Sequence, residues 1–299
     1  MATAYSQEYP LGSPTLSGNS ITVDLMLKEP TRINTYLSNI ALKGYFAERI
    51  FANGGGVSGG ALVYNQLTEN DLFPSRGAQE VAPGAEFPEV TFDRPEPKTA
   101  QVRKLGGKFR VTDEARDRND LSAIQAEGVK LGNDIQRQLH ARALSELEAS
   151  IAANPSTTGA GVSWADAINL TISTESKAAL PAADLANLRK KAAEKELGVE
   201  YNLLLLNPAE LANLEIIYGN AQAWLQAQGF SVAVSNIVTA GTAYAVQESM
   251  VGQVRYEQEL RTATWRDDAT ESTWVQSSIR PVFAVTNPFS VFKLTGLNA

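Results

Sequence analysis

The chain has 299 residues, 43% of them hydrophobic, and its net charge of -7 argues against the basic surface typical of proteins that grip nucleic acid. Cysteine is absent and there is one histidine, so disulfides, thiolate metal sites and clusters of histidine ligands are excluded, and we expect no cofactor. No apolar run is long enough to cross a bilayer, so we expect no association with a membrane.

The N-terminal part predicts an arm followed by a helix. Residues 1–29 are rich in Ser, Thr, Gly and Pro and show almost no amphipathic period, so we expect an extended arm that its own domain holds poorly. Pro30 then begins a helical segment, predicted over 30–52. Its inner face is expected to carry Ile33, Leu37, Ile40, Phe46 and Ile50.

Residues 53–100 predict a long β-ribbon. The glycine-rich run at 53–60 predicts a flexible break before it. Strands are predicted over 61–67, 86–93 and 99–111. The last of these is expected to be interrupted at Gly106-Gly107 and to run directly into the next helix. A ribbon of this kind buries little of its own surface and is marginal in water, so we expect it to rest on another subunit.

The charge of the ribbon is uneven. From Glu69 to Glu96 there are seven acidic residues against two arginines, and from Lys98 to Arg110 there are five basic residues and no acidic one. One interpretation is a solvated ribbon with both signs of charge. The other is that the acidic tip meets the basic base of a neighbouring copy. The candidate residues for this inter-subunit contact are Glu86, Glu89, Asp93, Arg103, Lys104, Lys108 and Arg110.

Residues 112–153 predict one long helix. Apolar or small residues recur every three or four positions from Leu121 onward, which is the period of one helix face. A second possible start at Asn119-Asp120 indicates that the first turns bend or break. The run ends at Asn154-Pro155, because proline disfavours helix in the residue before it. The part from Leu121 onward spans roughly 50 Å, so it needs an elongated surface to pack against.

The remaining chain divides into two patterns. Helices are expected over 183–197, 208–219 and 221–228, and strands over 201–207, 230–238 and 243–249, which indicates a compact α+β domain. Further long strands are predicted over 254–265, 274–285 and 290–296, without helices between them. These last strands are candidates for the sheet on which the long helix lies.

Motifs for catalysis are absent. The chain has no nucleotide-binding, zinc-protease or serine-hydrolase motif. The adjacent carboxylates Asp113-Glu114 and Asp267-Asp268 are explained by a helix start and a turn, which leaves a catalytic carboxylate pair as the weaker interpretation. His140 is predicted to be structural. Trp224 and Trp265 are predicted to fill the core.

The order of these parts resembles the major capsid proteins of tailed double-stranded DNA phages, which share the Hong Kong 97 phage fold. Three stretches carry the resemblance. KFRVTDEA (108–115) is similar to the strand-to-spine junction of that family, and YNLLLLNPAELANL (201–214) to its strand-Asn-Pro-helix unit. SSIRPVFAVTNPFSVFKLTG (277–296) is similar to its final pair of strands.

The resemblance implies an α+β fold with defined parts. These are an N-terminal arm (1–29), a short helical segment (30–52), an extended loop (53–100), a peripheral domain with the spine helix (101–154), an axial domain (155–272) and C-terminal strands that return to the peripheral domain (273–299). The implied function is structural and not enzymatic. Copies would form pentamers and hexamers of an icosahedral head in the virion, assembled in the host cytoplasm. The mild acidity would keep the contact with packaged double-stranded DNA weak.

The resemblance also implies partners. We expect a separate scaffolding protein, because fewer than about thirty residues precede the first helix, together with a portal and an optional decoration protein. Some relatives join a lysine of the extended loop to an asparagine of a neighbour. No lysine lies between Asn53 and Pro97, so we expect no such cross-link here. Two alternatives stay open: an encapsulin-like compartment shell and, from another class, a soluble hydrolase that uses the paired carboxylates.

Overall fold

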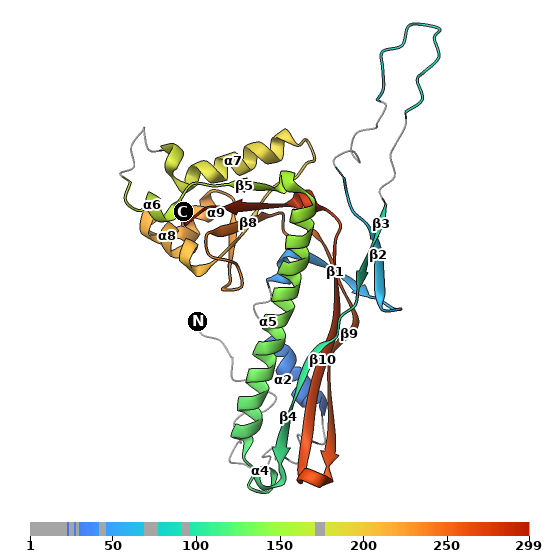
Figure 1. Cartoon of the computed structure of the whole chain (residues 1–299), viewed down its shortest axis with the longest axis vertical. Helices are drawn as coiled ribbons and strands as arrows, with labels where there is room; N and C mark the ends of the chain where they lie inside the picture. The colour runs from blue at the N-terminus through green and yellow to red at the C-terminus, as the bar shows by residue number, and fades with distance from the viewer. Residues whose placement is uncertain are drawn as a thin grey trace.

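The computed structural model describes residues 23, 27, 30–41, 46–68, 77–90, 96–170 and 177–298. The predicted N-terminal arm therefore lies almost wholly outside the described residues. Figure 1 shows an elongated molecule in which one long helix runs beside long strands. A compact group of helices and strands lies at one end, and a thin loop projects beyond that end.

The long helix is α5 (Leu121–Ala153), preceded by the short helix α4 (Asp113–Asp117). The hydroxyl of Thr112 accepts a hydrogen bond from the backbone N–H of Ala115, which caps α4. Asn119 has φ 53°, a left-handed conformation that asparagine tolerates better than most residues. The predicted break near this residue is confirmed.

A four-stranded sheet lies along α5, in the order β1-β9-β10-β4. Its strands are β1 (Phe51–Gly56), β9 (Gly252–Asp267), β10 (Ser272–Val285) and β4 (Leu105–Thr112). β1 is parallel to β9, and the other pairs are antiparallel. The helix α2 (Pro30–Ala41) packs against α5 and β9, and the single-turn helix α3 (Ala47–Ile50) leads into β1.

The compact end is built on a five-stranded sheet, in the order β5-β11-β8-β6-β7. Its strands are β5 (Thr158–Ala160), β11 (Val291–Thr295), β8 (Thr242–Val246), β6 (Leu203–Leu206) and β7 (Ser231–Val234). The helices around it are α6 (Trp164–Ala167), α7 (Pro181–Glu194), α8 (Pro208–Tyr218) and α9 (Ala221–Ala227). The four leucines of β6 are fully buried, as the continuous apolar run predicts.

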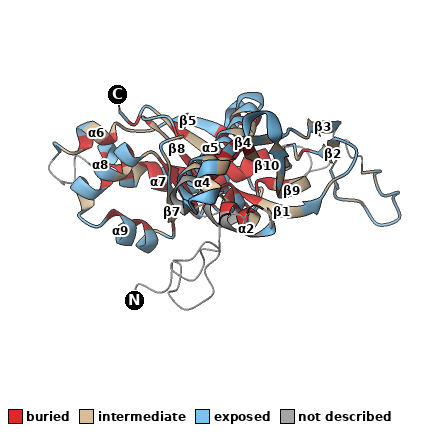
Figure 2. Cartoon of the chain, turned by 90° about the horizontal axis from the view of Figure 1, so that it is seen from below, coloured by how far each residue is buried: buried red, intermediate tan, exposed pale blue. Residues whose placement is uncertain are grey.

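The remaining elements are short. A two-stranded ribbon pairs β2 (Ala61–Asn65) with β3 (Pro97–Gln101). Short 3-10 helices lie at Pro155–Thr157, Lys177–Ala179, Asp268–Thr270 and Pro288–Ser290. Figure 2 shows that buried residues gather around the two larger sheets, whereas the projecting loop is exposed.

The long helix also joins the two larger sheets. One buried cluster combines Leu139 and Leu147 of α5 with Val254 of β9 and Leu205 of β6. Each fully buried side chain of this size contributes about 1.5–3 kcal/mol relative to an exposed one. Polar contacts add to this apolar packing: Lys293 of β11 forms an ion pair with Glu148 of α5, with Nζ and Oε1 2.6 Å apart.

Three predictions about strands are wrong. The glycine-rich stretch expected to be a flexible break begins as β1, because its backbone pairs with β9; at Gly54 a Cβ would lie 2.5 Å from Gln253 Oε1. Residues 86–90 form no strand, since nothing in the described chain pairs with them, and 91–93 lie outside the described residues. β4 runs through Gly106-Gly107, and the interruption falls at 102–104.

The two larger sheets combine strands from different predicted parts of the chain. β9 belongs to the four-stranded sheet, although the predicted axial domain (155–272) includes it, because β9 pairs with β10 along its whole length. β11 belongs to the five-stranded sheet and not to the peripheral one, since it pairs with β8 and β5. The chain therefore crosses between the two sheets twice after β8, once before β9 and once before β11.

His140 is predicted to make stability depend on pH. It is 6% exposed, its ring lies 4.2 Å from the ring of Phe46, and burial lowers its pKa to about 4. The unfolded chain, with a pKa near its ordinary value of about 6.5, binds more protons between these values. The free energy of unfolding should therefore fall by about 2 kcal/mol as the pH falls from about 6.5 to 4, allowing for partial solvent screening.

Denaturant unfolding at pH 7 and pH 4.5 measures this effect. Other groups also titrate in this range, so the matched variant His140→Leu supplies the reference. The native chain should lose about 2 kcal/mol more than the variant over this interval. An equal loss in both chains would rule out the assignment to His140.

Candidate functional site

The face of the four-stranded sheet that points away from α5 gathers basic and aromatic side chains. Side chains alternate between the faces of a strand. Gly107 faces α5, because a Cβ there would meet Leu131 at 2.6 Å, and Phe109 is buried on the same side. Lys108 and Arg110 therefore point outward, and both are exposed.

Two tryptophans accompany these cations. Trp265 and Trp274 are direct partners across β9 and β10, and their ring centroids lie 6.4 Å apart at an interplanar angle of 20°. Lys108 Nζ lies 4.3 Å from the ring centroid of Trp274 and 5.9 Å from that of Trp265, which is a cation–π arrangement. Trp265 is 39% exposed, so the prediction that it fills the core is wrong.

The other predicted basic residues lie before β4 in the chain. Arg103 and Lys104 are in the link between β3 and β4, and both are exposed. The backbone N–H of Arg103 donates to the carbonyl of Pro281 at 3.3 Å, which fixes the link against β10. Lys98, which the sequence groups with them, instead donates to Gln66 Oε1 at the base of the ribbon.

The acidic candidates lie on the projecting loop. Glu86 and Glu89 are exposed, and no residue from 77 to 90 is buried. Asp93 lies outside the described residues. Phe87, between the two glutamates, is 83% exposed. The sequence pattern does not single out this phenylalanine, because residues 86–93 together predict a strand.

The loop and the aromatic face lie far apart within one chain. In Figure 1 the loop projects at one end of the long axis, whereas the turn that joins β9 to β10 lies at the other end. Trp265 and Trp274 flank that turn, two residues from the end of β9 and the start of β10. The structure therefore does not bring the acidic and basic candidates together within one chain.

The base of the ribbon is anchored to the body of the protein. Gln66 is 7% exposed, and its Nε2 donates to Ser150 Oγ of α5 and to the carbonyl of Val285, each at 3.2 Å. The backbone N–H of Leu67 donates to the carbonyl of Thr286 at 2.7 Å. The projecting loop is thus held at a fixed point, next to the end of α5 and the end of β10.

The adjacent carboxylates do not form a catalytic pair. Asp113 is held by Arg266, with its Oδ2 2.7 Å from Nη2, and this hydrogen bond lowers the pKa of Asp113. Hydrogen bonds from Trp274 and Thr270 lower the pKa of Asp267, and Asp268 is paired with Arg266 Nε at 2.6 Å. A general acid or base needs a pKa near the working pH, and these shifts go in the opposite direction.

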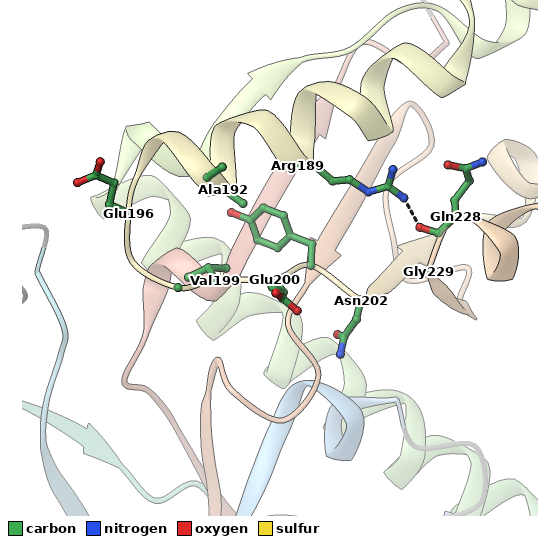
Figure 3. Close-up of a pocket in the computed structure, with 11 residues that line it drawn as sticks. Arg189, Ala192, Glu196, Val199, Glu200, Asn202, Gln228 and Gly229 are labelled. Atoms are coloured by element: carbon green, nitrogen blue, oxygen red, sulfur yellow. Dashed lines mark hydrogen bonds between the residues drawn. The ribbon is translucent and has the colours of Figure 1, made fainter.

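An open cavity of about 620 Å³ lies beside the C-terminal half of α7 (Figure 3). Two of its polar side chains are engaged within the fold: Arg189 donates to the carbonyl of Gln228, and the hydroxyl of Tyr201 donates to the carbonyl of Phe289 at 3.1 Å. Figure 3 shows Glu196 and Glu200 apart from one another, and both side chains are exposed. This cavity offers no convergent set of reactive side chains.

Neither a metal-binding cluster nor a membrane-spanning helix is found in the described part of the chain. Its His, Asp and Glu side chains form no group of three or more that could hold a metal ion. No helix there combines the length and the apolar character needed to cross a membrane. The outward face of the sheet and the projecting loop are therefore the candidate functional surfaces.

The chain matches one protein family and is similar to several solved structures. The family model described as phage capsid protein matches residues 95–294. A virus-like particle from Pyrococcus furiosus is similar in structure, with 14% identity, a TM-score of 0.59 and coverage of 86% of this chain and 97% of that chain.

Two phage structures are similar as well. The structure from Mycobacterium phage Cain has 14% identity, a TM-score of 0.59 and coverage of 85% of this chain and 90% of that chain. The capsid of cyanophage P-SCSP1u has 14% identity, a TM-score of 0.54 and coverage of 83% and 88%. The comparison with curated protein sequences gave no significant match.

Proposed function

The chain belongs to the phage capsid protein family, and we propose on this premise that its copies form the pentamers and hexamers of an icosahedral head that encloses double-stranded DNA. The resemblance and the α+β fold of the Hong Kong 97 type predicted from the sequence are confirmed, and the chain is a subunit of a capsid shell in the virion. The observation that carries the proposal is the family match, because it spans the long helix, the five-stranded sheet almost to the end of β11, and every strand of the four-stranded sheet except β1.

The anchored loop supports assembly into rings. An acidic loop at one end of the chain and a basic face at the other are two different surfaces of opposite charge, and opposite charge favours a contact between copies. A contact between two different surfaces is head-to-tail, and it closes into a ring when the rotation between copies allows it. Pentamers and hexamers are rings of this kind.

The proposed cargo is double-stranded DNA. The net charge of -7 suits a container, because like charge keeps the shell from adhering to packed DNA. The test is to isolate particles from cells that produce the complete set of virion proteins and to treat them with nuclease. Protected DNA of uniform length supports the proposal, and particles without DNA contradict it.

A second candidate function is a compartment shell of the encapsulin type. The similarity to the virus-like particle from Pyrococcus furiosus favours it. In that case the same particles would contain a protein cargo and no protected DNA. Mass spectrometry of the particle contents distinguishes the two functions.

The partners and place of assembly follow from the same proposal. We expect a scaffolding protein, a portal and an optional decoration protein to act with the shell, and assembly to take place in the host cytoplasm. Affinity pull-down from infected cells, with the tagged shell protein as bait, tests whether these proteins bind the shell protein. Recovery of the shell protein alone at every stage of assembly would contradict their involvement.

Reversal of two basic charges is predicted to weaken assembly. In the variant with Lys104→Glu and Lys108→Glu, the acidic loop of a neighbour would face like charge. The protein concentration needed for assembly should rise about tenfold at low salt, and by less in high salt, which screens exposed charges. Sedimentation of shells against protein concentration measures it.

The matched control reverses two exposed lysines elsewhere, Lys177→Glu and Lys190→Glu. This control changes the net charge equally but leaves the outward face of the sheet intact. An equal loss of assembly in both variants, or no dependence on salt, would contradict a specific role for Lys104 and Lys108.

The shell is also predicted to lack covalent cross-links. No lysine lies between Asn53 and Pro97, and Lys98 is engaged with Gln66 at the base of the ribbon. Arginine does not replace lysine as a nucleophile, because its guanidinium stays protonated. Denaturing electrophoresis of mature particles should give one band near 32.2 kDa for this protein. A ladder of multimers that resists boiling in detergent would refute the prediction.

A further inference from the structure

The most exposed aromatic residue of the described chain is presented on the projecting loop. Phe87 is 83% exposed and is flanked by Glu86, Pro88 and Glu89. The residue before a proline is restricted to extended conformations, which limits the directions in which Phe87 can point. Its apolar ring is therefore covered very little by the described part of its own chain.

The outward face of the four-stranded sheet offers a complementary seat. The ring of Trp265 is partly open to solvent, and Lys108 lies over the adjoining ring of Trp274. Arg110 is the direct cross-strand partner of Trp274. Among the described residues, neither Lys108 nor Arg110 takes part in an ion pair.

We propose that Phe87 of one copy seats against Trp265 and Trp274 of a second copy, with Glu86 and Glu89 facing Lys108 and Arg110. This inference rests on the proposed function and identifies the anchor of the contact between subunits. The occupant is a second copy of this chain, because the projecting loop and the turn between β9 and β10 lie near opposite ends of one molecule, and the loop is acidic whereas the seat is basic.

The chemistry of the two surfaces suits a single anchor. Aromatic rings attract each other in offset or edge-to-face arrangements, and tryptophan attracts cations over its face. A buried aromatic residue surrounded by charged groups is a common form of a dominant contact at protein interfaces. In this contact Glu86 and Glu89 supply the specificity for the basic surface, and the ring of Phe87 supplies most of the binding free energy.

Proximity can be tested directly, because the chain has no cysteine. The variant with Ala85→Cys and Ala263→Cys places one thiol two residues from Phe87 and the other two residues from Trp265, both at exposed positions. Assembled shells are treated with a short thiol–thiol cross-linker. We expect a covalent ladder from dimer upward, because every copy carries both thiols.

Two controls make the result specific. Ala85→Cys combined with Ala227→Cys, an exposed position on α9, should give no ladder. Adding Phe87→Ala to the first pair should reduce dimer formation about tenfold, whereas Phe87→Tyr should leave it within about twofold. A ladder of equal strength with Ala227→Cys, or one that Phe87→Ala does not change, would overturn the inference.

The failure of this inference differs from the failure of the proposed function. If the native chain forms closed shells but the first cysteine pair gives no ladder, the function stands and Phe87 contacts another surface, which overturns the inference. If the native chain forms no shells under any condition, the proposed function itself fails. Electron microscopy of the same samples before cross-linking separates these outcomes.

Discussion

Replacing residues 69–95 with a short Gly-Ser linker is expected to abolish shell formation and to leave a folded chain. The described part of this segment, 77–90, has no buried residue, so its removal takes nothing from the core. Gln66 and Leu67 keep their contacts with Ser150 and Thr286 at the base of the ribbon. The free energy of unfolding should therefore change by less than about 1 kcal/mol.

Sedimentation and denaturant unfolding measure the two effects separately. A second variant retains the length of the loop but replaces 77–90 with Gly-Ser sequence, and it should also fail to assemble. This variant distinguishes loss of the side chains from loss of reach. Shells of normal yield from either variant would show that the loop is dispensable.

Removal of one buried carboxylate is expected to destabilise the compact end. Asp184 of α7 is 3% exposed and accepts hydrogen bonds from Trp164 Nε1 at 2.8 Å and from the backbone N–H of Val162 at 3.1 Å. Asp184→Ala would leave one buried donor, the indole N–H of Trp164, and one half-buried donor, the backbone N–H of Val162, without this acceptor. The free energy of unfolding should fall by about 3 kcal/mol, since each orphaned group costs about 1–3 kcal/mol.

Two variants control this prediction. Asp184→Asn keeps one oxygen that can accept a hydrogen bond, but its NH2 group would face a donor of the protein. We therefore expect an intermediate loss of about 2 kcal/mol in the free energy of unfolding. Asp166→Ala removes an exposed carboxylate from the neighbouring helix α6 and should change stability by less than about 0.5 kcal/mol. A loss below about 1 kcal/mol for Asp184→Ala would contradict the role assigned to the carboxylate.

Elements whose signal is local were predicted well from the sequence. The spacing of Leu139, Leu147 and other apolar residues predicts that one face of α5 is buried. In the structure these side chains are buried. The continuous leucines of β6 report burial on both sides of a sheet. On the short helices before β1, Ile33, Leu37, Phe46 and Ile50 are buried as expected, and the side chain of Ile40 lies outside the described residues.

Elements that depend on distant pairing were not predictable in the same way. β1 contains Gly54-Gly55-Gly56, which reads as a break because glycine has little preference for a strand. Its partner β9 begins about two hundred residues later in the chain, and the pairing overrides the local preference. Residues 86–90 show the reverse case, because an alternating pattern without a partner strand forms no strand in the described chain.

The sequence predicts the two cations of the candidate site but not its two tryptophans. The alternation of Lys108 and Arg110 with Phe109 and Val111 places the two cations on an outward face, and the structure agrees. The tryptophans could not be assigned to that face, because their position depends on the register between β9 and β10. A large aromatic residue taken alone favours the core, and this preference produced the wrong prediction for Trp265.

The central claim is that this chain builds a closed shell from many copies. Its most direct test is electron microscopy of the purified full-length protein, together with its mass by light scattering, in the presence and absence of a co-expressed scaffolding protein. We expect closed particles of uniform diameter in the megadalton range, with rings of five and six subunits in the averaged images. A small oligomer of fixed size under both conditions would contradict the claim.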